Sequence, residues 1–275
     1  MPIDPVGGWE RVQMANASEQ VPEGHTPDPG PGPTFEAHAE THVGLVRKVN
    51  EDSILDLADI GLWVVADGVG GADAGDRASQ LIVESLRALT GPTSAPSFLN
   101  DIRATLEGVN AQLRVEAVAR GSGRLIASTV VCLLFFERWY CCVWAGDSRI
   151  YRLHGGQFEQ LTHDHSEVQS LLDYGLISPE EARQHPSANV ITRAVGADDA
   201  LVLDAVEGLI EPGDAFLLCS DGLTKVVDDH EIGAVLSSTN AVEAVNRLIQ
   251  MALDRGAPDN VSVAIVKTDG TSPGI

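Results

Sequence analysis

Hydrophobic and polar positions along the chain predict several short strands and a few long helices. Apolar runs of strand length cover residues 62–66, 128–136, 139–145, 149–153, 201–206, 216–219 and 261–267. Apolar positions recur at helical spacing within residues 78–86, 99–117, 232–236 and 242–252. Short polar segments at 137–138 and 154–157 predict hairpins. Because hairpins and paired helices do not alternate as β-α-β, the pattern favours an α+β fold of antiparallel sheets flanked by helices.

The distribution of proline, glycine and charge divides the chain into a tail and a domain. Residues 21–33 contain five of the fourteen prolines and lack helical or strand periodicity, so we expect a flexible tail over residues 1–35. The domain is expected over residues 36–270. Within it, a charged insertion at about 161–196 carries short helix-like pieces between two strands. This position predicts a surface flap.

Length and charge limit the class of protein. With 275 residues, of which 44% are hydrophobic, the chain can form one large domain or two small ones, with a substantial core. Its 40 acidic and 18 basic side chains give a net charge of −22, which disfavours nucleic acid and an anionic membrane surface as partners. A phosphorylated substrate would therefore need bound metal cations to reverse the local field.

Several features favour a cytoplasmic protein. The longest clean apolar run, 130–136, is too short to cross a bilayer, which needs about 20 residues. The N-terminus lacks the basic segment and following apolar stretch of a secretory signal. The four cysteines lie in apolar runs and form no Cys-x-x-Cys pair, as expected for reduced, buried thiols.

Acidic side chains stand at the ends of four predicted strands. They are Asp67 after 62–66, Asp147 after 139–145, Asp221 after 216–220 and Asp259 before 261–266. Few Lys or Arg residues lie near them in the sequence, so converging carboxylates would repel one another and raise one another's pKa. Hard divalent cations such as Mg²⁺ or Mn²⁺ would remove that repulsion. A single Asp-Gly step is more often a turn than a ligand, and it is the conjunction of the four that favours a metal site.

Five motifs occur in the order and approximate spacing of a known enzyme family. They are Arg47-x-x-Asn50-Glu51-Asp52, Asp67-Gly68-Val69-Gly70-Gly71, Gly146-Asp147-Ser148-Arg149, Ser220-Asp221-Gly222 and Asp259-Asn260. Through these motifs, residues 36–268 resemble the metal-dependent protein phosphatase family (PPM, or type 2C serine/threonine phosphatases), and segments 161–166 and 189–196 resemble its bacterial branch. The resemblance implies a central β-sandwich of two antiparallel sheets with helices on both faces (α-β-β-α) and a flap subdomain.

The resemblance also implies a role for each motif residue. Two divalent metal ions, Mn²⁺ or Mg²⁺, would be held by Glu51, Asp67, the Gly68 carbonyl, Asp221 and Asp259. A third, weaker metal would be bound by Asp147 together with Asp221. Asp52 would support a metal-bound water, and the planar fork of Arg47 would bind the substrate phosphate. By similarity, a metal-bridging hydroxide would attack the phosphorus of phosphoserine or phosphothreonine directly, without a phosphoenzyme.

Two positions depart from the family pattern. Eukaryotic relatives carry a His after the Asp-Gly, where it can protonate the leaving group, and Val69 stands there in this chain. Bacterial members commonly lack that His, so activity is still expected. A metal-bound water is the preferred general acid, and His163 and His165 are alternatives whose other role is to anchor the flap. Ala127 replaces a family glycine, which is a mild change.

Three functions stay open at this point. The first is an active serine/threonine protein phosphatase, a signalling enzyme that dephosphorylates protein substrates and opposes a cognate Ser/Thr kinase. The second is a catalytically silent domain of the same family, and the third is a two-metal hydrolase of a small phosphorylated molecule. The complete acid set favours the first over the second. We expect a monomer with no nucleic-acid or membrane partner, and the motifs do not specify the substrate.

Overall fold

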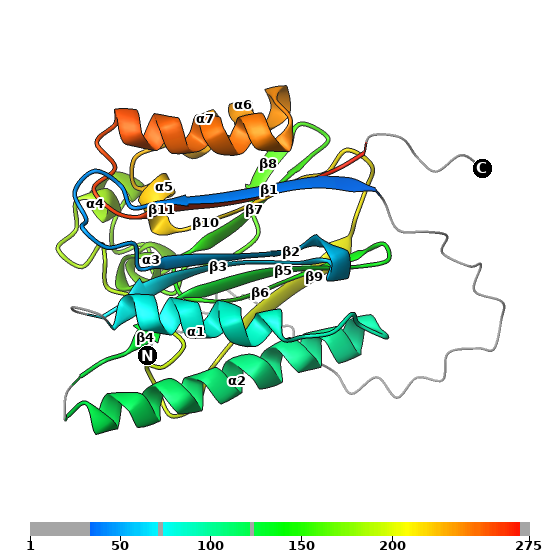
Figure 1. Ribbon diagram of the computed structural model, residues 1–275. Helices are drawn as coiled ribbons and strands as arrows, with labels where there is room; N and C mark the ends of the chain where they lie inside the picture. The colour runs from blue at the N-terminus through cyan, green and yellow to red at the C-terminus, as the bar shows by residue number, and fades with distance from the viewer. Residues whose placement is uncertain (1–33, 71–73, 122–123, 270–275) are drawn as a thin grey trace, which may run out of the picture. The chain divides into compact units, whose positions relative to one another are not determined.

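Two antiparallel sheets stack against each other in the computed structural model, which describes residues 34–70, 74–121 and 124–269 (Figure 1). In spatial order, the first sheet consists of β1 (Phe35–His42), β11 (Val261–Thr268), β10 (Ala215–Cys219), β7 (Arg149–His154) and β8 (Gln157–Gln160). The second sheet consists of β2 (Asp52–Leu57), β3 (Leu62–Val69), β5 (Val130–Phe136), β6 (Trp139–Ala145) and β9 (Asp204–Leu209), with β4 (Ala127–Ser128) paired to β3.

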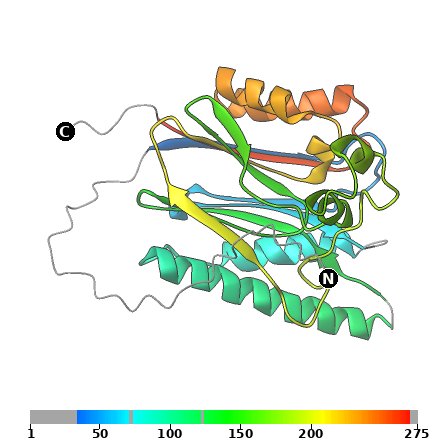
Figure 2. The ribbon, with the colours of Figure 1, turned by 180° about the vertical axis from the view of Figure 1, so that it is seen from behind.

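Helices cover the outer face of each sheet (Figures 1 and 2). The second sheet is covered by α1 (Gly75–Arg87) and α2 (Ala95–Ala119), and the first by α6 (Asp229–Ser238) and α7 (Ala241–Asp254). The short 3-10 helix η1 (Ala58–Ile60) joins β2 to β3. The segment predicted to form a flap contains α3 (Glu167–Asp173) and α4 (Pro179–Arg183), and α5 (Asp221–Thr224) follows β10 closely.

Three apolar layers hold the sheets and helices together. Val64 packs in the layer between the second sheet and α1 and α2, Trp63 and Phe216 pack between the two sheets, and Leu217 and Leu248 pack between the first sheet and α6 and α7. The neighbours Trp63 and Val64 are both fully buried although they point to opposite faces of β3. A strand covered on both faces is apolar throughout, which explains the unbroken apolar run at the start of β3.

The structure confirms the predicted fold class and differs at particular elements. Both predicted hairpins are present, between β5 and β6 and between β7 and β8. The sequence pattern missed β1 and β2, because polar residues interrupt the apolar positions of both strands. The strand predicted at 201–206 is wrong at its start: Leu201 and Leu203 pack against the core beneath α1 and α2, and the strand β9 begins at Asp204.

The described residues belong to one compact unit. The tail predicted over residues 1–35 lies outside the described residues except for Thr34 and Phe35, and Phe35 already belongs to β1. Across the described ranges, no helix combines the length and apolar character that a membrane span needs.

Strand register brings the acidic ends of the strands to one edge of the two sheets. The last residue of β10 pairs with β11 near the start of β11, which follows Asp259. The same residue pairs with the start of β7, which follows Asp147. Asp221 lies just beyond that last residue. In the second sheet, Asp52 and Asp67 are directly paired across β2 and β3. The stacked sheets therefore present these five carboxylates to one region.

Candidate active site

Asp67 lies among four other carboxylates at the end of β3. Burial raises its pKa well above the usual range, and repulsion from Asp52, Asp221, Asp147 and Asp259 raises it further. Each of these acids comes from a different strand end or loop, up to about 200 residues apart in the chain. The convergence that the sequence predicted is therefore present.

Glu51 joins these five acids, and we call the six residues the carboxylate cluster. Burial is the main factor that raises the pKa of Glu51, and the nearby Arg47 opposes that rise. The first turn of α1 leaves no room for a side chain here: a Cβ on Gly75 would lie 2.7 Å from Glu51 Oε1 and 2.8 Å from the Gly68 carbonyl oxygen. Glu51 and the Gly68 carbonyl are therefore neighbours, and only glycine fits the helix start beside them.

Asp52 is buried, and its hydrogen bonds satisfy only one of its two oxygens. Ser220 Oγ and Ser262 Oγ donate to Asp52 Oδ2 at 2.8 and 2.7 Å. Asp52 Oδ1 is buried and has no partner among the described residues. Burial, with repulsion from Asp221 and Asp259, raises the pKa of Asp52 to about 7. The serines fix this carboxylate and leave one oxygen free to accept from a ligand or a water molecule.

Two basic side chains neutralise part of the carboxylate cluster. Lys225 Nζ lies 2.6 Å from Asp221 Oδ2 and 3.3 Å from Asp259 Oδ2. The guanidinium of Arg47 forms a fork on Asp259, with Nε 2.9 Å from Oδ1 and Nη2 3.0 Å from Oδ2. The expectation that few basic residues stand near these acids is wrong for Lys225, because it follows Asp221 by one helical turn and shares its face.

Only one of the two carboxylate oxygens of Asp221 has a partner in the described part of the chain. Its Oδ1 is buried without a partner in the described part of the chain, while Oδ2 is held by Lys225. Burial raises the pKa of Asp221, and the attraction of Lys225 opposes that rise. Burial in turn lowers the pKa of Lys225, but its ion pairs with Asp221 and Asp259 outweigh burial and raise it overall.

Asn260 ties the two halves of the site together. Its Oδ1 accepts from the Glu51 backbone N–H at 2.9 Å. Its Nδ2 donates to the carbonyl oxygens of Val43 and Val49 at 2.9 and 3.0 Å. The loop that carries Arg47 and Glu51 is thereby fixed to the residue next to Asp259.

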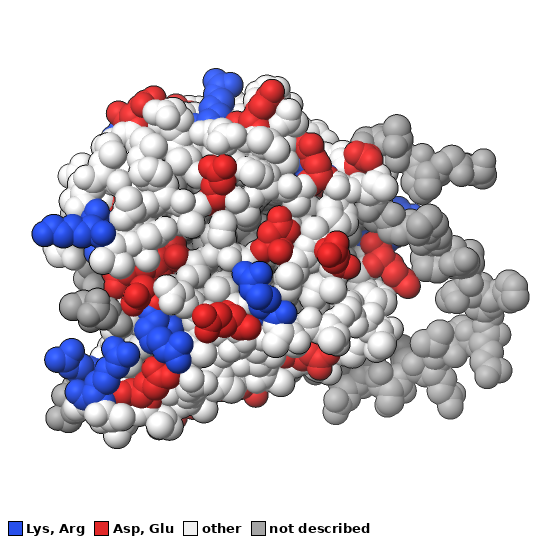
Figure 3. Space-filling view, in the orientation of Figure 1, with Lys and Arg blue, Asp and Glu red and all other residues white. Residues whose placement is uncertain are grey.

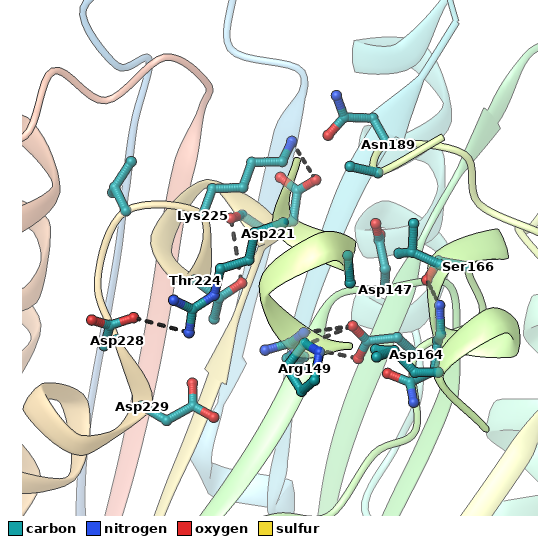
Figure 4. A pocket seen from close by; sticks show the side chains of 18 of the residues that line it. Asp147, Arg149, Asp164, Ser166, Asn189, Asp221, Thr224, Lys225, Asp228 and Asp229 are labelled. Atoms are coloured by element: carbon teal, nitrogen blue, oxygen red, sulfur yellow. Dashed lines mark hydrogen bonds and ion pairs between the residues drawn. The ribbon is translucent and has the colours of Figure 1, made fainter. Parts of the chain in front are cut away.

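A cavity of about 810 Å³ opens beside the cluster, between the flap and the segment that contains α5 and the start of α6 (Figure 4). Asp147 and Asp221 are among the residues that line it, so the cavity reaches the cluster. Burial, with repulsion from Asp221 and Asp164, raises the pKa of Asp147 to about 7. Arg183 of the flap and Asp228 also line the cavity and form an ion pair at 3.4 Å.

The two flap histidines are engaged by other groups. The Gly146 N–H donates to His165 Nδ1 at 3.1 Å, and His165 Nε2 lies 3.1 Å from Asp204 Oδ2. Burial lowers the pKa of His165, which favours its neutral form. His163 Nε2 lies 2.8 Å from Asp173 Oδ2 in the flap helix α3. These contacts fit the anchoring role of the two histidines better than the role of a general acid.

The chemistry of the carboxylate cluster fits a divalent metal. Its donors are oxygens. Two of these oxygens, Asp52 Oδ1 and Asp221 Oδ1, are buried without partners in the described ranges. Burial, together with repulsion from the neighbouring acids, raises the pKa of Asp67. Within the described ranges, no three His, Cys, Asp or Glu side chains already stand in the geometry of a metal site. Lys225 and Arg47 instead hold Asp221 and Asp259 in ion pairs.

The acidity of the chain is not confined to the cluster. Figure 3 shows acidic side chains spread over the face of the described residues that Figure 1 presents. A phosphate group that approaches such a surface is repelled until a local cation attracts it.

The structure brings the predicted site residues together and adds others that the sequence analysis did not select. Gly75, Lys225 and Ser262 contact the cluster but lie in no predicted motif. The only local signal was the spacing of Lys225, four residues after Asp221. Ser262 gave no signal, because its contact with Asp52 joins residues 210 positions apart.

Comparison with known proteins identifies the family. The model of the family described as "Protein phosphatase 2C" matches residues 46–261, a range that includes the five motifs from Arg47 to Asn260. The chain belongs to the protein phosphatase 2C family. This membership confirms the resemblance inferred from the motifs.

Two of the similar proteins come from bacteria. The chain is 38% identical over 232 residues to "Serine/threonine protein phosphatase PstP" of Mycobacterium tuberculosis, a match that covers 82% of this chain and 44% of PstP. The chain thus spans less than half the length of this relative. The structure of "PppA, a key regulatory component of T6SS in Pseudomonas aeruginosa" is similar at 46% identity and a TM-score of 0.79, over 85% of this chain and 97% of PppA.

A further similar structure was solved with metal bound. The catalytic domain of PstP in complex with 2 manganese ions has 33% identity and a TM-score of 0.77, over 86% of this chain and 98% of that domain. These similarities confirm the sandwich of two antiparallel sheets flanked by helices.

Proposed function

We propose that this chain is a metal-dependent phosphatase that hydrolyses phosphoserine and phosphothreonine in proteins. The observation that carries the proposal is the carboxylate cluster, with buried oxygens on Asp52 and Asp221 that lack partners in the described ranges. Its membership of the protein phosphatase 2C family and the two manganese ions in the similar PstP domain support the proposal. A catalytically silent domain would have no reason to keep such a costly arrangement of buried acids.

Two divalent cations, Mn²⁺ or Mg²⁺, would be held by Glu51, Asp67, the Gly68 carbonyl, Asp221 and Asp259. When bound, they supply the Lewis acidity that activates water and neutralises the phosphate charge. Asp147 lies on the side of the cluster that faces the cavity, and we propose it with Asp221 for a third, weaker metal.

The chain's own residues position the substrate and the water. Arg47 is half exposed at the rim, and its fork already binds one planar oxyanion, the Asp259 carboxylate. We assign it the same bidentate contact with substrate phosphate oxygens. Asp52, fixed by Ser220 and Ser262, uses its free oxygen to orient the attacking water. Val69 cannot donate a proton, so water is assigned as the acid for the leaving group.

The wider setting is also part of the proposal. The substrates are phosphorylated proteins, and the phosphatase opposes a cognate Ser/Thr kinase in a signalling pathway. We propose a monomer in the bacterial cytoplasm that binds neither nucleic acid nor membrane. Light scattering of the purified chain tests the monomer.

A turnover assay tests the function. We expect Mn²⁺-dependent hydrolysis of both an aryl phosphate and a phosphothreonine peptide, abolished by a chelator and by Asp221→Asn. The matched control is Asp59→Asn, which removes the same charge from an exposed position in η1. This control should keep wild-type turnover.

The outcomes separate the three functions. Absence of metal-dependent turnover on both substrates, with the protein folded, would leave a silent domain. Turnover of the aryl phosphate, with no turnover of the phosphothreonine peptide or of a wider panel of phosphopeptides, would favour a hydrolase of small phosphorylated molecules.

A further inference from the structure

The ammonium group of Lys225 stands between two of the carboxylates that we assign to the metals. Its Nζ contacts Asp221 Oδ2 at 2.6 Å and Asp259 Oδ2 at 3.3 Å. The side chain is 29% exposed, and Figure 4 shows it directed at Asp221. An ammonium is a compact charge with three donors, so Lys225 serves two carboxylates as a bridging cation would.

The local fold fixes the backbone of Lys225 and leaves its side chain able to move. The Lys225 N–H donates to the Asp221 carbonyl oxygen at 2.9 Å, which sets the separation of the two residues at the end of α5. The side chain has four rotatable bonds and lines the 810 Å³ cavity. It can therefore leave Asp221 and enter the cavity without a change in the backbone.

Asp221 depends on Lys225 more than Asp259 does. Asp259 has a second cation, Arg47, which contacts both of its oxygens from the exposed side. In the described part of the chain, Lys225 is the cation in contact with Asp221, whose Oδ1 has no partner. The charge of Lys225 also reaches Asp147, on which its attraction acts.

We propose that Lys225 is a built-in counter-ion that stabilises the metal-free site and competes with divalent cations for Asp221 and Asp259. A divalent cation that binds these carboxylates either displaces the ammonium or binds beside it against repulsion. Both routes weaken metal binding. The inference rests on the proposed function, because it assumes that the cluster is a metal site, and it adds a residue that tunes the metal affinity.

The experiment compares Mn²⁺ affinities of the full chain by titration calorimetry. Lys225→Met keeps the length of the side chain and removes its charge. We expect its dissociation constant for Mn²⁺ to fall by about tenfold or more relative to wild type. In a chelator, the variant should also melt at a lower temperature than wild type, because Asp221 and Asp259 lose their shared counter-ion.

Two further variants separate the local charge from other effects. Lys48→Met removes the same charge from an exposed side chain and should bind Mn²⁺ as wild type does. Lys225→Arg keeps the charge and should stay within a few-fold of wild type. If Lys225→Met does not stay folded in a chelator, Lys225→Gln and Lys225→Met are prepared with Mn²⁺, and competition with a chelating dye gives their affinities.

The outcomes distinguish the inference from the proposed function. Equal Mn²⁺ affinities of wild type, Lys225→Met and Lys48→Met would overturn the inference, while Mn²⁺-dependent turnover by the same wild-type preparation would leave the proposed function intact. Absence of Mn²⁺ binding by all variants would overturn both. Tighter binding by Lys225→Met with no change in Lys48→Met supports the inference whatever the turnover of the variant.

Discussion

The two ends of β10 carry two acids that differ in how fully the protein satisfies them. Asp214 precedes the strand and is fully buried. Its Oδ2 accepts from Arg152 Nη2 at 2.6 Å and from the Glu211 N–H at 2.8 Å, and its Oδ1 lies 2.7 Å from His154 Nδ1. Asp221 follows the strand, and only one of its oxygens has a partner in the described residues.

This difference teaches that burial alone does not mark a functional acid. A buried carboxylate whose oxygens are both paired with protein groups needs no ligand. Asp214 is such a carboxylate, and it holds a turn and two strands together. A buried oxygen without a partner costs free energy that a ligand can recover. Asp221 and Asp52 carry such oxygens at the same edge of the sheets, and that edge is the site.

The largest expected effect separates Asp221 from Asp214. Asp221→Asn should lower turnover roughly 1,000-fold, or about 4 kcal/mol of transition-state stabilisation, because a metal ligand is lost. Asp214→Asn should lower the free energy of unfolding by about 3–5 kcal/mol, because Arg152 loses its carboxylate partner, and should not change turnover of the folded fraction. Steady-state kinetics and urea unfolding measure both. Equal loss of turnover in the two variants would break the comparison.

Mn²⁺ should stabilise the folded protein through Asp221, at one end of β10, and not through Asp214, at the other. At about 100 times its dissociation constant, Mn²⁺ should raise the free energy of unfolding by about 2.7 kcal/mol. Asp214→Asn should show the same gain, and Asp221→Asn should lose most of it. Thermal melting with Mn²⁺ and with a chelator gives the two differences, and a full gain in Asp221→Asn would remove Asp221 from the ligand set.

Substitution by lysine should have different effects on Arg47, which contacts Asp259, and on Arg152, which contacts Asp214. Arg47→Lys should lower kcat/KM by about tenfold to a hundredfold with little loss of stability, because the bidentate fork is lost at a half-exposed position. Arg152→Lys should lower the free energy of unfolding by about 1–3 kcal/mol, because Arg152 donates both to Asp214 and to the Leu209 carbonyl. Its kcat/KM should not change. Paired kinetic and unfolding measurements decide between these two roles.

The smallest effect concerns Asp52 and its dependence on pH. Its pKa is about 7 in the folded protein against an ordinary value of 3.8, so the unfolded chain releases the proton first. In the metal-free protein, this group therefore costs stability that grows as pH rises from about 4 to 7 and is constant above 7. Asp52→Asn should be more stable than wild type by about 1–2 kcal/mol at pH 8 and by less at pH 5, as measured by urea unfolding in a chelator.

A control keeps this last prediction specific. Asp59→Asn removes a carboxylate from an exposed position, so its unfolding free energy should follow wild type at both pH values. An Asp52→Asn variant with the same stability as wild type at pH 8 would show that the buried carboxylate is satisfied in solution.

Much of the fold could be predicted because the evidence lies in neighbouring residues. The apolar run of β3 is buried on both faces, and the hairpins follow short polar segments that join apolar runs. The strands β1 and β2 could not be found in this way. β1 pairs with β11, more than 200 residues away. β2 lies next to its partner β3 in the chain, but polar residues interrupt its apolar positions, so no strand pattern stands out.

The sequence by itself determined which acids stand at strand ends and which family the chain resembles, since motifs and periodicity are properties of contiguous residues. Only the tertiary structure decided the charge balance of the site. Lys225 bridging Asp221 and Asp259, the serines on Asp52 and the close approach of Gly75 to Glu51 all depend on sheet register and stacking. The physical reason is that a hydrogen bond or ion pair acts over a few ångströms, whatever the separation of its partners along the chain.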